Sequence, residues 1–499
     1  MFNKILVANR GEIAVRVIRA CREMGITPVA VHSDADRASL HVRMAQEAYS
    51  IGASPASESY LNIEKILDAA KKCGAQAIHP GYGFLSENAN FAEACANAQI
   101  KFIGPSPAAM RIMGSKTRAR EQMEKSGVPC VPGDSRALES PEQAAQTANR
   151  IGYPVILKAA AGGGGKGMRL VEGLSDLKSA LIAAQSEAER AFGNGEVYME
   201  RAILNPRHIE VQILADEHGN TIYLGERECS IQRRHQKVLE ECPSPFVDAD
   251  MRKRMGEVAV RAASSVGYAN AGTVEFLVDK DKSFYFLEMN TRLQVEHPVT
   301  ELVTGLDLVQ LQIRIAAGEE LPIQQDDVSL RGHAIECRIY AEDPENHYYP
   351  SPGKITCWLE PSGPGVRVDG GVFEGWTVPT DYDPLLAKLT SYGENREQAI
   401  ARSRRALDEV FVGGIQTNVA LFKRILSDPE FRAGRIDTGF LDRPTTAAAG
   451  ANDEQKRLAA IATGLFAAMG KDKSREFDGG MGSSCESKWR IVAKNESVE

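Results

Sequence analysis

Residues 284–301 read FYFLEMNTRLQVEHPVTE, and polar side chains occupy every second position through the middle of this stretch. If the chain is extended here, one face is packed and the other carries a row of carboxylates, amides and a guanidinium. The preceding residues, 272–290, alternate like a β-hairpin whose turn is DKDK at 279–282. That hairpin brings Glu275 into the same neighbourhood. The polar residues of the row are Glu288, Asn290, Arg292, Gln294 and Glu296.

Two carboxylates held this close repel each other unless a cation lies between them. Magnesium and manganese prefer carboxylate oxygens and bridge to phosphates, so Glu275, Glu288 and Asn290 are candidate metal ligands. Arg292 offers a planar fork suited to a small oxyanion such as bicarbonate. Glu296 is then a candidate general base. The alternative interpretation of the same alternation is an ordinary strand with one face in solvent.

A glycine-rich loop lies at residues 159–170, AAAGGGGKGMRL. Glycine lets backbone N–H groups approach phosphate oxygens closely, and Lys166 adds a mobile positive charge. The loop is not a P-loop, because Ala160 stands at the first glycine position and Gly167 follows the lysine. We expect a lid that orders over an anionic ligand. A plain strand connection is the alternative.

Composition narrows the class of protein. The chain has 499 residues, too many for one core, so about three domains are expected. A net charge of −8 argues against nucleic acid as a partner. No apolar run reaches the roughly 18 residues of a membrane span, and the N-terminus lacks a signal-peptide pattern. Nine scattered cysteines without C-x-x-C spacing indicate reduced thiols in the cytoplasm.

Hydrophobic periodicity predicts the organisation of the chain. Strands and helices alternate through residues 1–114, which predicts an open, mostly parallel α/β sheet of Rossmann-like type. The first strand is not followed by G-x-G-x-x-G, so we do not predict a dinucleotide site. The pattern becomes strand-rich after residue 206, and a helix-like segment near 454–470 follows a linker. The predicted domains are 1–114, 115–330 with a lid at about 131–203, 331–445, and a C-terminal extension at 446–499.

The glycine loop, the upstream lysines and the Glu…Glu-x-Asn pattern resemble the ATP-grasp ligases. Further motifs resemble the biotin carboxylase family and occur in its order over about residues 1–445. The resemblance implies an α/β and α+β protein, with an ATP-grasp fold between an N-terminal Rossmann-like (pre-ATP-grasp) domain and a C-terminal biotin carboxylase domain. The motifs are ANRGEIAVRVIRA, HPGYGFLSEN, FIGPSP, GSKTRAR, KAAAGGGGKGMR, NPRHIEVQ, ERECSIQRRHQKVLEE, FLEMNTRLQVEHPVTE and ECRIYAEDP.

The resemblance also implies an activity. A biotin carboxylase is a ligase that uses ATP, Mg²⁺ or Mn²⁺, and bicarbonate to carboxylate biotin through carboxyphosphate, releasing ADP and phosphate. This chain has no Met-Lys-Met, the usual setting of a biotinylated lysine, so biotin is expected on a separate biotin carboxyl carrier protein. A homodimeric state is also implied, together with a separate carboxyltransferase subunit. The final acceptor stays open among acetyl-CoA, propionyl-CoA, pyruvate and another oxo acid.

Matching motifs carry the family's functional residues onto this chain. ATP-binding residues are implied at Lys116, Lys158, Gly163, Gly164, Gly165, Lys166, Gly167, Glu200, Arg201, Ile203, His208, Gln232 and His235. Bicarbonate binding is implied for Lys237, Arg292, Gln294 and Val295, and biotin binding for Tyr82 and Arg338. The implied catalytic residues are Glu296, Arg338, Lys237 and Arg292, and the implied metal ligands are Glu275, Glu288 and Asn290.

Two other functions fit parts of the pattern. One is a different bicarbonate-using ATP-grasp ligase, of the carbamoyl-phosphate or purine carboxylation type. The other is a non-catalytic nucleotide-binding subunit, which predicts the loss of metal and base residues. Single residues also have structural alternatives: Lys116 and Lys158 as surface lysines, residues 233–237 as a solvated basic run, and His208 and Tyr82 as core side chains.

Overall fold

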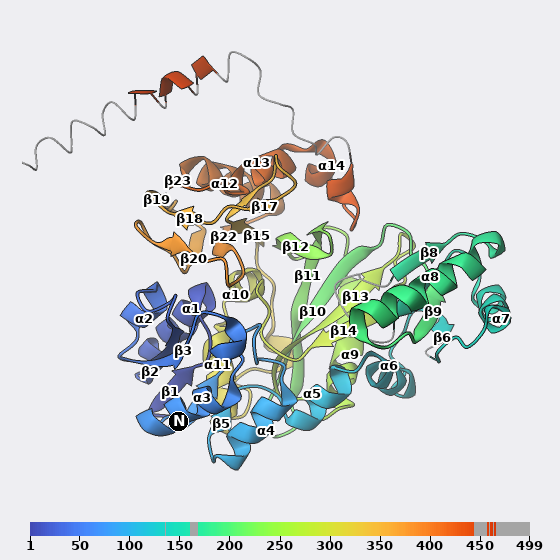
Figure 1. Cartoon of the computed structure of the whole chain (residues 1–499), viewed down its shortest axis with the longest axis horizontal. Coiled ribbons are helices and arrows are strands. Elements are labelled where there is room, and N and C mark those ends of the chain that lie inside the picture. The colour runs from blue at the N-terminus through green and yellow to red at the C-terminus, as the bar shows by residue number, and fades with distance from the viewer. Residues whose placement is uncertain (135, 160–167, 444–456, 459, 463, 466–499) are drawn as a thin grey trace, which may run out of the picture. The chain divides into compact units, whose positions relative to one another are not determined.

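The structure is a computed structural model that describes residues 1–134, 136–159, 168–443, 457–458, 460–462 and 464–465 (Figure 1). The chain divides into two units, Met1–Thr446 and Ala447–Glu499. In the second unit the described residues are helical, as predicted for this segment. Within the described part of the chain, no helix has the length and apolar character needed to cross a bilayer.

The N-terminal part is the predicted parallel α/β sheet, with strand order β3-β2-β1-β4-β5. Short apolar runs such as KILV form its buried strands, and helices with one buried face cover them. A strand that the sequence analysis did not predict, β3, forms one edge. The strands are β1 (Lys4–Val7), β2 (Thr27–Ser33), β3 (Glu47–Gly52), β4 (Ala77–His79) and β5 (Lys101–Phe102). The helices are α1 (Gly11–Glu23), α2 (Leu40–Met44), η1 (Ala56–Glu58), α3 (Ile63–Cys73), α4 (Ala89–Asn97) and α5 (Pro107–Met113).

A four-stranded sheet, β6-β9-β7-β8, forms the small unit predicted as a lid, on the right of Figure 1. Its core gathers Leu157, Val171, Leu181 and Met199 between the sheet and two helices. Helix α6 (Lys116–Lys125) precedes it. Its elements are β6 (Gly133–Asp134), α7 (Pro141–Ile151), β7 (Val155–Ala159), β8 (Met168–Val171), α8 (Leu174–Phe192) and β9 (Val197–Arg201).

An eight-stranded antiparallel sheet is the largest sheet of the first unit, with order β14-β13-β10-β11-β12-β15-β22-β20. Strand β12 pairs with β15, so a single sheet crosses the sequence position near 330 where we predicted a boundary. The strands are β10 (Arg207–Ala215), β11 (Thr221–Arg233), β12 (Gln236–Cys242), β13 (Asn270–Val278), β14 (Phe284–Asn290), β15 (His333–Tyr340), β20 (Val366–Gly370) and β22 (Leu385–Gly393).

Helices cover this sheet: α9 packs on β10 and β11, α11 on β13, and α10 on β11, β12, β15 and β22. The C-terminal part adds helices and short ribbons around a core that includes Trp376, Phe422 and Phe431. The covering helices are α9 (Ala249–Ser264), α10 (His297–Thr304) and α11 (Leu308–Ala316), followed by η2 (Gln325–Asp327). The remaining elements are β16 (Glu342–Asp343), β17 (Tyr349–Pro350), β18 (Gly353–Lys354), β19 (Cys357–Leu359), β21 (Thr377–Val378), α12 (Arg396–Glu409), β23 (Phe411–Gly413), α13 (Val419–Ser427), α14 (Pro429–Arg432) and η3 (Phe440–Asp442).

Candidate active site

Lys237, on β12, is the centre of a buried charge cluster. Its Nζ lies 2.8 Å from Glu275 Oε1 and 2.7 Å from Glu296 Oε1, and it also pairs with Glu210. Burial opposes the lysine charge, but the three carboxylates outweigh it and raise the pKa of Lys237 well above its usual range. The ammonium is therefore permanently charged and is available to meet negative charge on a bound substrate.

Glu296, the predicted general base, is fully buried directly before α10. Its second oxygen, Oε2, lies 2.9 Å from Arg338 Nη2, and Arg338 also lies 2.5 Å from Glu240 Oε1. Although burial raises the pKa of Glu296, Lys237 and Arg338 together hold it well below the usual range. Burial raises the pKa of Glu240 to about 8. Glu296 is thus the ionised carboxylate of the pair that Arg338 contacts.

Glu275 and Glu288 face each other across the β13–β14 pair, in direct register. Glu275 accepts hydrogen bonds from Asn290 Nδ2 at 2.8 Å and Gln294 Nε2 at 3.1 Å, and lies 2.8 Å from His208 Nε2. Desolvation, and then the charge of Glu275, raise the pKa of Glu288. Two carboxylates in register, one raising the pKa of the other, form a donor set that fits Mg²⁺ or Mn²⁺.

Arg292 is oriented by three side-chain acceptors. Its Nε donates to Glu87 Oε2, Nη1 to Gln294 Oε1 and Nη2 to Asn290 Oδ1, each at 2.9 Å. Glu87 also accepts from the Thr291 backbone N–H at 2.8 Å, so it joins a loop of the N-terminal part to this segment. The guanidinium is therefore oriented before any substrate binds.

The segment after Asn290 departs from the extended strand that we considered. β14 ends at Asn290, residues 291–296 form a loop, and α10 begins at His297. The alternation still has a structural consequence, because Asn290 and Gln294 both donate to Glu275 from opposite ends of the turn. The polar residues surround one carboxylate instead of forming one face of a strand.

A second cluster gathers around Glu200. Glu200, on β9, lies 2.5 Å from Lys158 Nζ and 2.7 Å from Arg120 Nη1. Gln232 Nε2 lies 2.9 Å from His208 Nδ1, and His208 in turn contacts Glu275, so these two predicted residues adjoin the first cluster. Most of the predicted cations and amides therefore meet within two neighbouring clusters.

The other predicted residues have varied environments. Burial lowers the pKa of Lys116, at the start of α6, while the charge of Glu288 acts in the opposite direction. Arg201 and His235 are exposed, and His235 has a positive φ of 65° in the turn between β11 and β12. Ile203 is half-buried between β9 and β10. Gly163, Gly164, Gly165, Lys166 and Gly167 lie outside the described residues.

Tyr82 and Val295 also border the main cluster. The Tyr82 hydroxyl is buried with no hydrogen-bond partner among the described residues, and its ring centroid lies 5.8 Å from Lys388 Nζ. The Val295 carbonyl accepts a hydrogen bond from the same Lys388 at 2.8 Å.

Sequence reasoning missed the carboxylates that hold the cations in place: Glu87, Glu210 and Glu240. A signal for Glu210 was present, because His208, Glu210 and Gln212 alternate with apolar residues in RHIEVQILA, the same pattern as at 288–296. Arg227, fully buried beside Glu210 at 2.5 Å, was also missed. Arg227 stands directly opposite Glu210 on the neighbouring strand, and it also donates to Thr273 and to Thr300. These last two partners are 46 and 73 positions away in the sequence, so no local pattern marks them.

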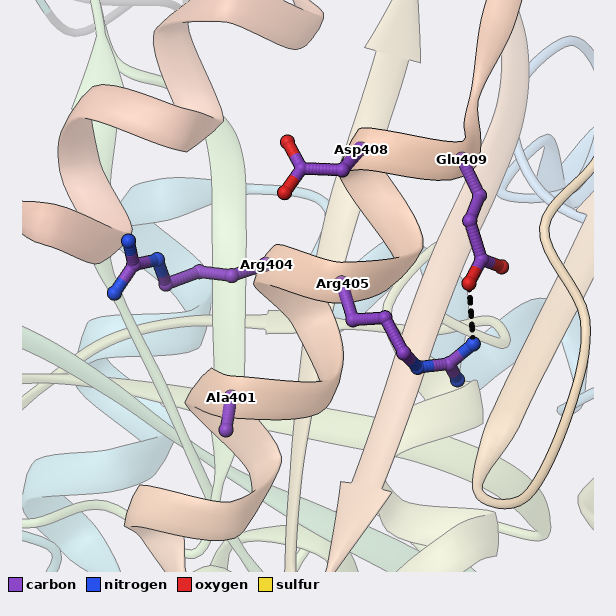
Figure 2. Close-up of a pocket in the computed structure, with 5 residues that line it drawn as sticks. All are labelled: Ala401, Arg404, Arg405, Asp408 and Glu409. Carbon is purple, nitrogen blue, oxygen red and sulfur yellow. Dashed lines mark hydrogen bonds and ion pairs between the residues drawn. The ribbon is translucent and has the colours of Figure 1, made fainter.

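A separate hollow lies on the solvent side of α12 (Figure 2). Its lining includes Arg405 and Glu409, which pair at 2.7 Å one helical turn apart, and Asp408, which pairs with Lys423 at 2.8 Å. None of the predicted functional residues lines it. Intrahelical and surface ion pairs of this kind are usual on a solvated helix face.

Comparison with known proteins identifies relatives along nearly the whole chain. Residues 1–110 match the model of the biotin carboxylase N-terminal domain, and 336–443 that of the biotin carboxylase C-terminal domain. Residues 115–324 match the model of the carbamoyl-phosphate synthase L chain ATP-binding domain.

Individual relatives cover the same region. A biotin carboxylase of Nostoc sp. is 56% identical over 440 residues, 88% of this chain and 98% of its own. A pyruvate carboxylase subunit of Methanothermobacter thermautotrophicus is 53% identical over 442 residues, 89% of this chain and 90% of its own. The biotin carboxylase domain dimer of Hydrogenobacter thermophilus 2-oxoglutarate carboxylase, solved with MgADP, ADP and bicarbonate, is 47% identical with a TM-score of 0.85, covering 90% of this chain and 99% of that one.

Proposed function

The chain belongs to the biotin carboxylase family, and on that premise we propose how its own side chains divide the work of the reaction. It is an ATP-dependent ligase that carboxylates biotin with bicarbonate, producing carboxybiotin, ADP and phosphate. The assignment of roles depends on one observation: Glu296 contacts Lys237 through Oε1 and Arg338 through Oε2.

Bicarbonate is a poor electrophile, so ATP must first convert it to carboxyphosphate. Lys237, Arg292, Gln294 and the Val295 backbone bind the bicarbonate and orient it toward the γ-phosphate of ATP. Holding the two reactants in line can contribute up to about 7–11 kcal/mol toward the barrier. The existing contacts of Arg292 with Glu87, Asn290 and Gln294 support this role, because they fix the fork before substrate arrives.

Glu296 removes the proton of bicarbonate. In the described arrangement its pKa is too low for a good base, because Lys237 and Arg338 both stabilise the carboxylate. A bound anion competes for those same N–H donors. As Lys237 turns toward the bicarbonate oxygens, the pKa of Glu296 rises toward the range in which it accepts a proton. Substrate binding thereby activates the base.

The nucleotide is held by the second cluster and its surroundings. Lys116 and Lys158 contact its phosphates, Glu200 and the backbone of Arg201 to Ile203 hold the adenine, and His208, Gln232 and His235 lie by the ribose and phosphates. Residues 163–167 close over the phosphates and exclude water, which protects carboxyphosphate from hydrolysis. Glu275 and Glu288, with Asn290 beside them, would hold Mg²⁺ or Mn²⁺. The metal supplies positive charge that stabilises the transferring phosphoryl group.

Carboxyphosphate then yields carbon dioxide and phosphate, and the basic phosphate takes the ureido proton of biotin. Arg338 stabilises the negative charge that develops on the ureido oxygen, and Tyr82 lies against the biotin ring. Glu240, with its raised pKa, leaves most of the Arg338 charge available for this step.

Partners follow from the chemistry of the family. The relatives include one subunit of a multi-subunit carboxylase and a domain solved as a dimer. We propose that this chain is a homodimer that receives biotin on a separate carrier protein and passes the carboxyl group to a carboxyltransferase subunit. The eight cysteines of the described residues are free, which fits a cytoplasmic location. The domain limits 1–114, 115–330, 331–445 and 446–499 are part of the same proposal.

The test is ADP release by the purified chain with MgATP and bicarbonate, with and without free biotin. We expect stimulation by biotin that requires bicarbonate and is lost in Glu296→Gln, while ATP binding is kept. Bicarbonate-dependent turnover that is indifferent to both biotin and a biotinylated carrier protein would instead support another bicarbonate-using ligase. ATP binding without turnover would support a non-catalytic subunit.

A further inference from the structure

A second buried cation, Lys388, lies beside the catalytic cluster. It stands on β22, directly opposite Arg338 of β15 on one side and Asp369 of β20 on the other. Residues paired across neighbouring strands point to the same face of a sheet. Lys388 therefore extends from the same face as Arg338, one strand further from Glu240.

Lys388 connects the C-terminal part to two other regions of the first unit. Its side chain has no exposed area, and its Nζ donates to the Val295 carbonyl at 2.8 Å. The same Nζ lies 3.3 Å from Glu12 Oε2 at the start of α1. The Tyr82 ring centroid is 5.8 Å away. One lysine on the C-terminal part thus meets the loop before α10 and two N-terminal segments.

Burying an ammonium is costly unless its charge and its donors are satisfied. Glu12 supplies a nearby carboxylate, although burial raises the pKa of that carboxyl to about 7. Asp369, directly opposite on β20, adds a second carboxylate, whose pKa Arg367 and Lys388 lower against the effect of burial. These carboxylates balance the charge of Lys388, and the Val295 carbonyl accepts a hydrogen bond from its ammonium. Conversely, Val295 lies in the loop 291–296, outside helix and strand, so Lys388 helps to hold a carbonyl that no regular ladder restrains.

The Val295 carbonyl belongs to the peptide that leads directly into Glu296. On its other side is Gln294, which donates to Glu275 and whose own carbonyl contacts His297 Nδ1 at 2.8 Å. Lys388 and His297 thus restrain two consecutive peptide groups between the proposed bicarbonate ligands and the proposed base.

We propose that Lys388 is a positioning residue that holds the Val295–Glu296 peptide in the orientation needed to bind and deprotonate bicarbonate. This inference rests on the proposed function, because it assigns Lys388 a role through Val295 and Glu296. Lys388 itself acts through the carbonyl and need not touch the substrate.

The test compares Lys388→Met, which keeps the length of the side chain and removes its charge, with a matched control elsewhere. Lys4 on β1 makes the same two kinds of contact: its Nζ donates to the Cys73 carbonyl at 2.9 Å and pairs with Glu47 at 2.6 Å. Lys4→Met therefore removes a lysine–carbonyl bond and an ion pair outside the site. Thermal unfolding and ATP binding are measured on both variants to establish that each is folded.

In Lys388→Met we expect KM for bicarbonate to rise, or kcat/KM for bicarbonate to fall, by about 10- to 100-fold, the range for losing a hydrogen bond to a charged group. KM for ATP should stay within about twofold, since none of the proposed nucleotide residues that the structure describes contacts Lys388. Lys4→Met should leave both constants at wild-type values. Glu12→Gln keeps the Val295 bond and should change KM for bicarbonate by less than threefold.

Equal losses for ATP and bicarbonate in a folded Lys388→Met protein, or no loss for either, would overturn the positioning role. If Lys388→Met does not fold, Lys388→Arg takes its place, because arginine keeps the charge but carries its donors on a wider planar group that does not reproduce the Lys388–Val295 bond. A loss of bicarbonate use larger than the loss for ATP supports the positioning role, and equal losses or no loss overturn it. Direct bicarbonate binding, measured by calorimetry in the presence of MgADP, separates this inference from the proposed function. A wild-type chain that binds bicarbonate without carboxylating biotin refutes the proposed function alone, and the affinity of Lys388→Met then tests the inference. A wild-type chain that neither binds nor uses bicarbonate refutes both.

Discussion

Acid should remove a specific part of the stability of the C-terminal region, through Glu241. This carboxylate on β12 is fully buried and accepts from His333 Nε2 at 2.7 Å and from Arg396 Nε at 2.6 Å and Nη2 at 3.0 Å. Burial raises the pKa of Glu241, but His333 and Arg396 outweigh it and lower the pKa from 4.5 to about 2. The folded state therefore binds this proton less readily than the unfolded chain.

The sign and size of the effect follow from that difference. A depressed folded pKa contributes stability that is complete above about pH 4.5 and is lost as the pH falls through 2. A lowering of the pKa by about 2.5, at about 1.4 kcal/mol for each pKa unit, corresponds to roughly 3–4 kcal/mol at neutral pH. The same linkage leaves about 2 kcal/mol of it at pH 3.5.

The assay is urea unfolding of the wild-type chain and Glu241→Gln at pH 7 and pH 3.5, followed by fluorescence and circular dichroism. The variant should be less stable by about 3 kcal/mol or more at pH 7, because the half-buried Arg396 loses its charged partner. The difference in unfolding free energy between variant and wild type should narrow at pH 3.5. Glu226→Gln is the matched contrast, since Glu226 is also buried and pairs with Arg252 at 2.6 Å, but burial raises its pKa. The stability of the wild-type chain relative to Glu226→Gln should therefore rise, not fall, between pH 7 and pH 3.5. A Glu241→Gln gap that stays constant from pH 7 to pH 3.5 would refute the reasoning.

Further outcomes concern the site and its supports. Arg338→Gln should lower the biotin-dependent rate by roughly 100- to 1,000-fold, while ATP affinity is kept; steady-state ADP release and calorimetry measure the two. Glu87→Gln should raise KM for bicarbonate about tenfold, because Arg292 loses a charged partner; an unchanged KM would contradict this. Gly371→Ala should cost about 1–3 kcal/mol of stability, read from thermal unfolding, since a Cβ there would lie 2.6 Å from the backbone nitrogen of Glu12. Chelation by EDTA should abolish ADP release, and added Mg²⁺ should restore it.

Local pattern predicted the N-terminal part of the fold well. Short apolar runs separated by amphipathic helices specified a parallel sheet, because each element buries one face against its sequence neighbours. The hairpin of 270–290 was equally readable, since alternation and a polar turn act over a few residues. The edge strand β3 was missed for two reasons. Its residues alternate only weakly between buried and exposed positions, and the strand that pairs with it, β2, belongs to another part of the sequence.

In the candidate site, too, local sequence predicted some features and missed those that depend on distant residues. Residue types alone suggested Glu275, Glu288, Arg292 and Glu296, because carboxylates and a guanidinium in close spacing have few structural uses. The partners that fix them could not be read locally: Glu87 reaches Arg292 across 205 positions of sequence.

What the sequence by itself determined is therefore the set of elements, the family, and the chemically distinctive side chains, since these depend on composition and spacing along the chain. Only the tertiary structure decided that one sheet continues from β12 to β15, that residues 291–296 turn around Glu275, and that Lys388 meets Val295 and Glu12. The physical reason is that a buried charge is stabilised by whichever groups the fold brings within about 3 Å, and sequence distance sets no limit on which groups those are.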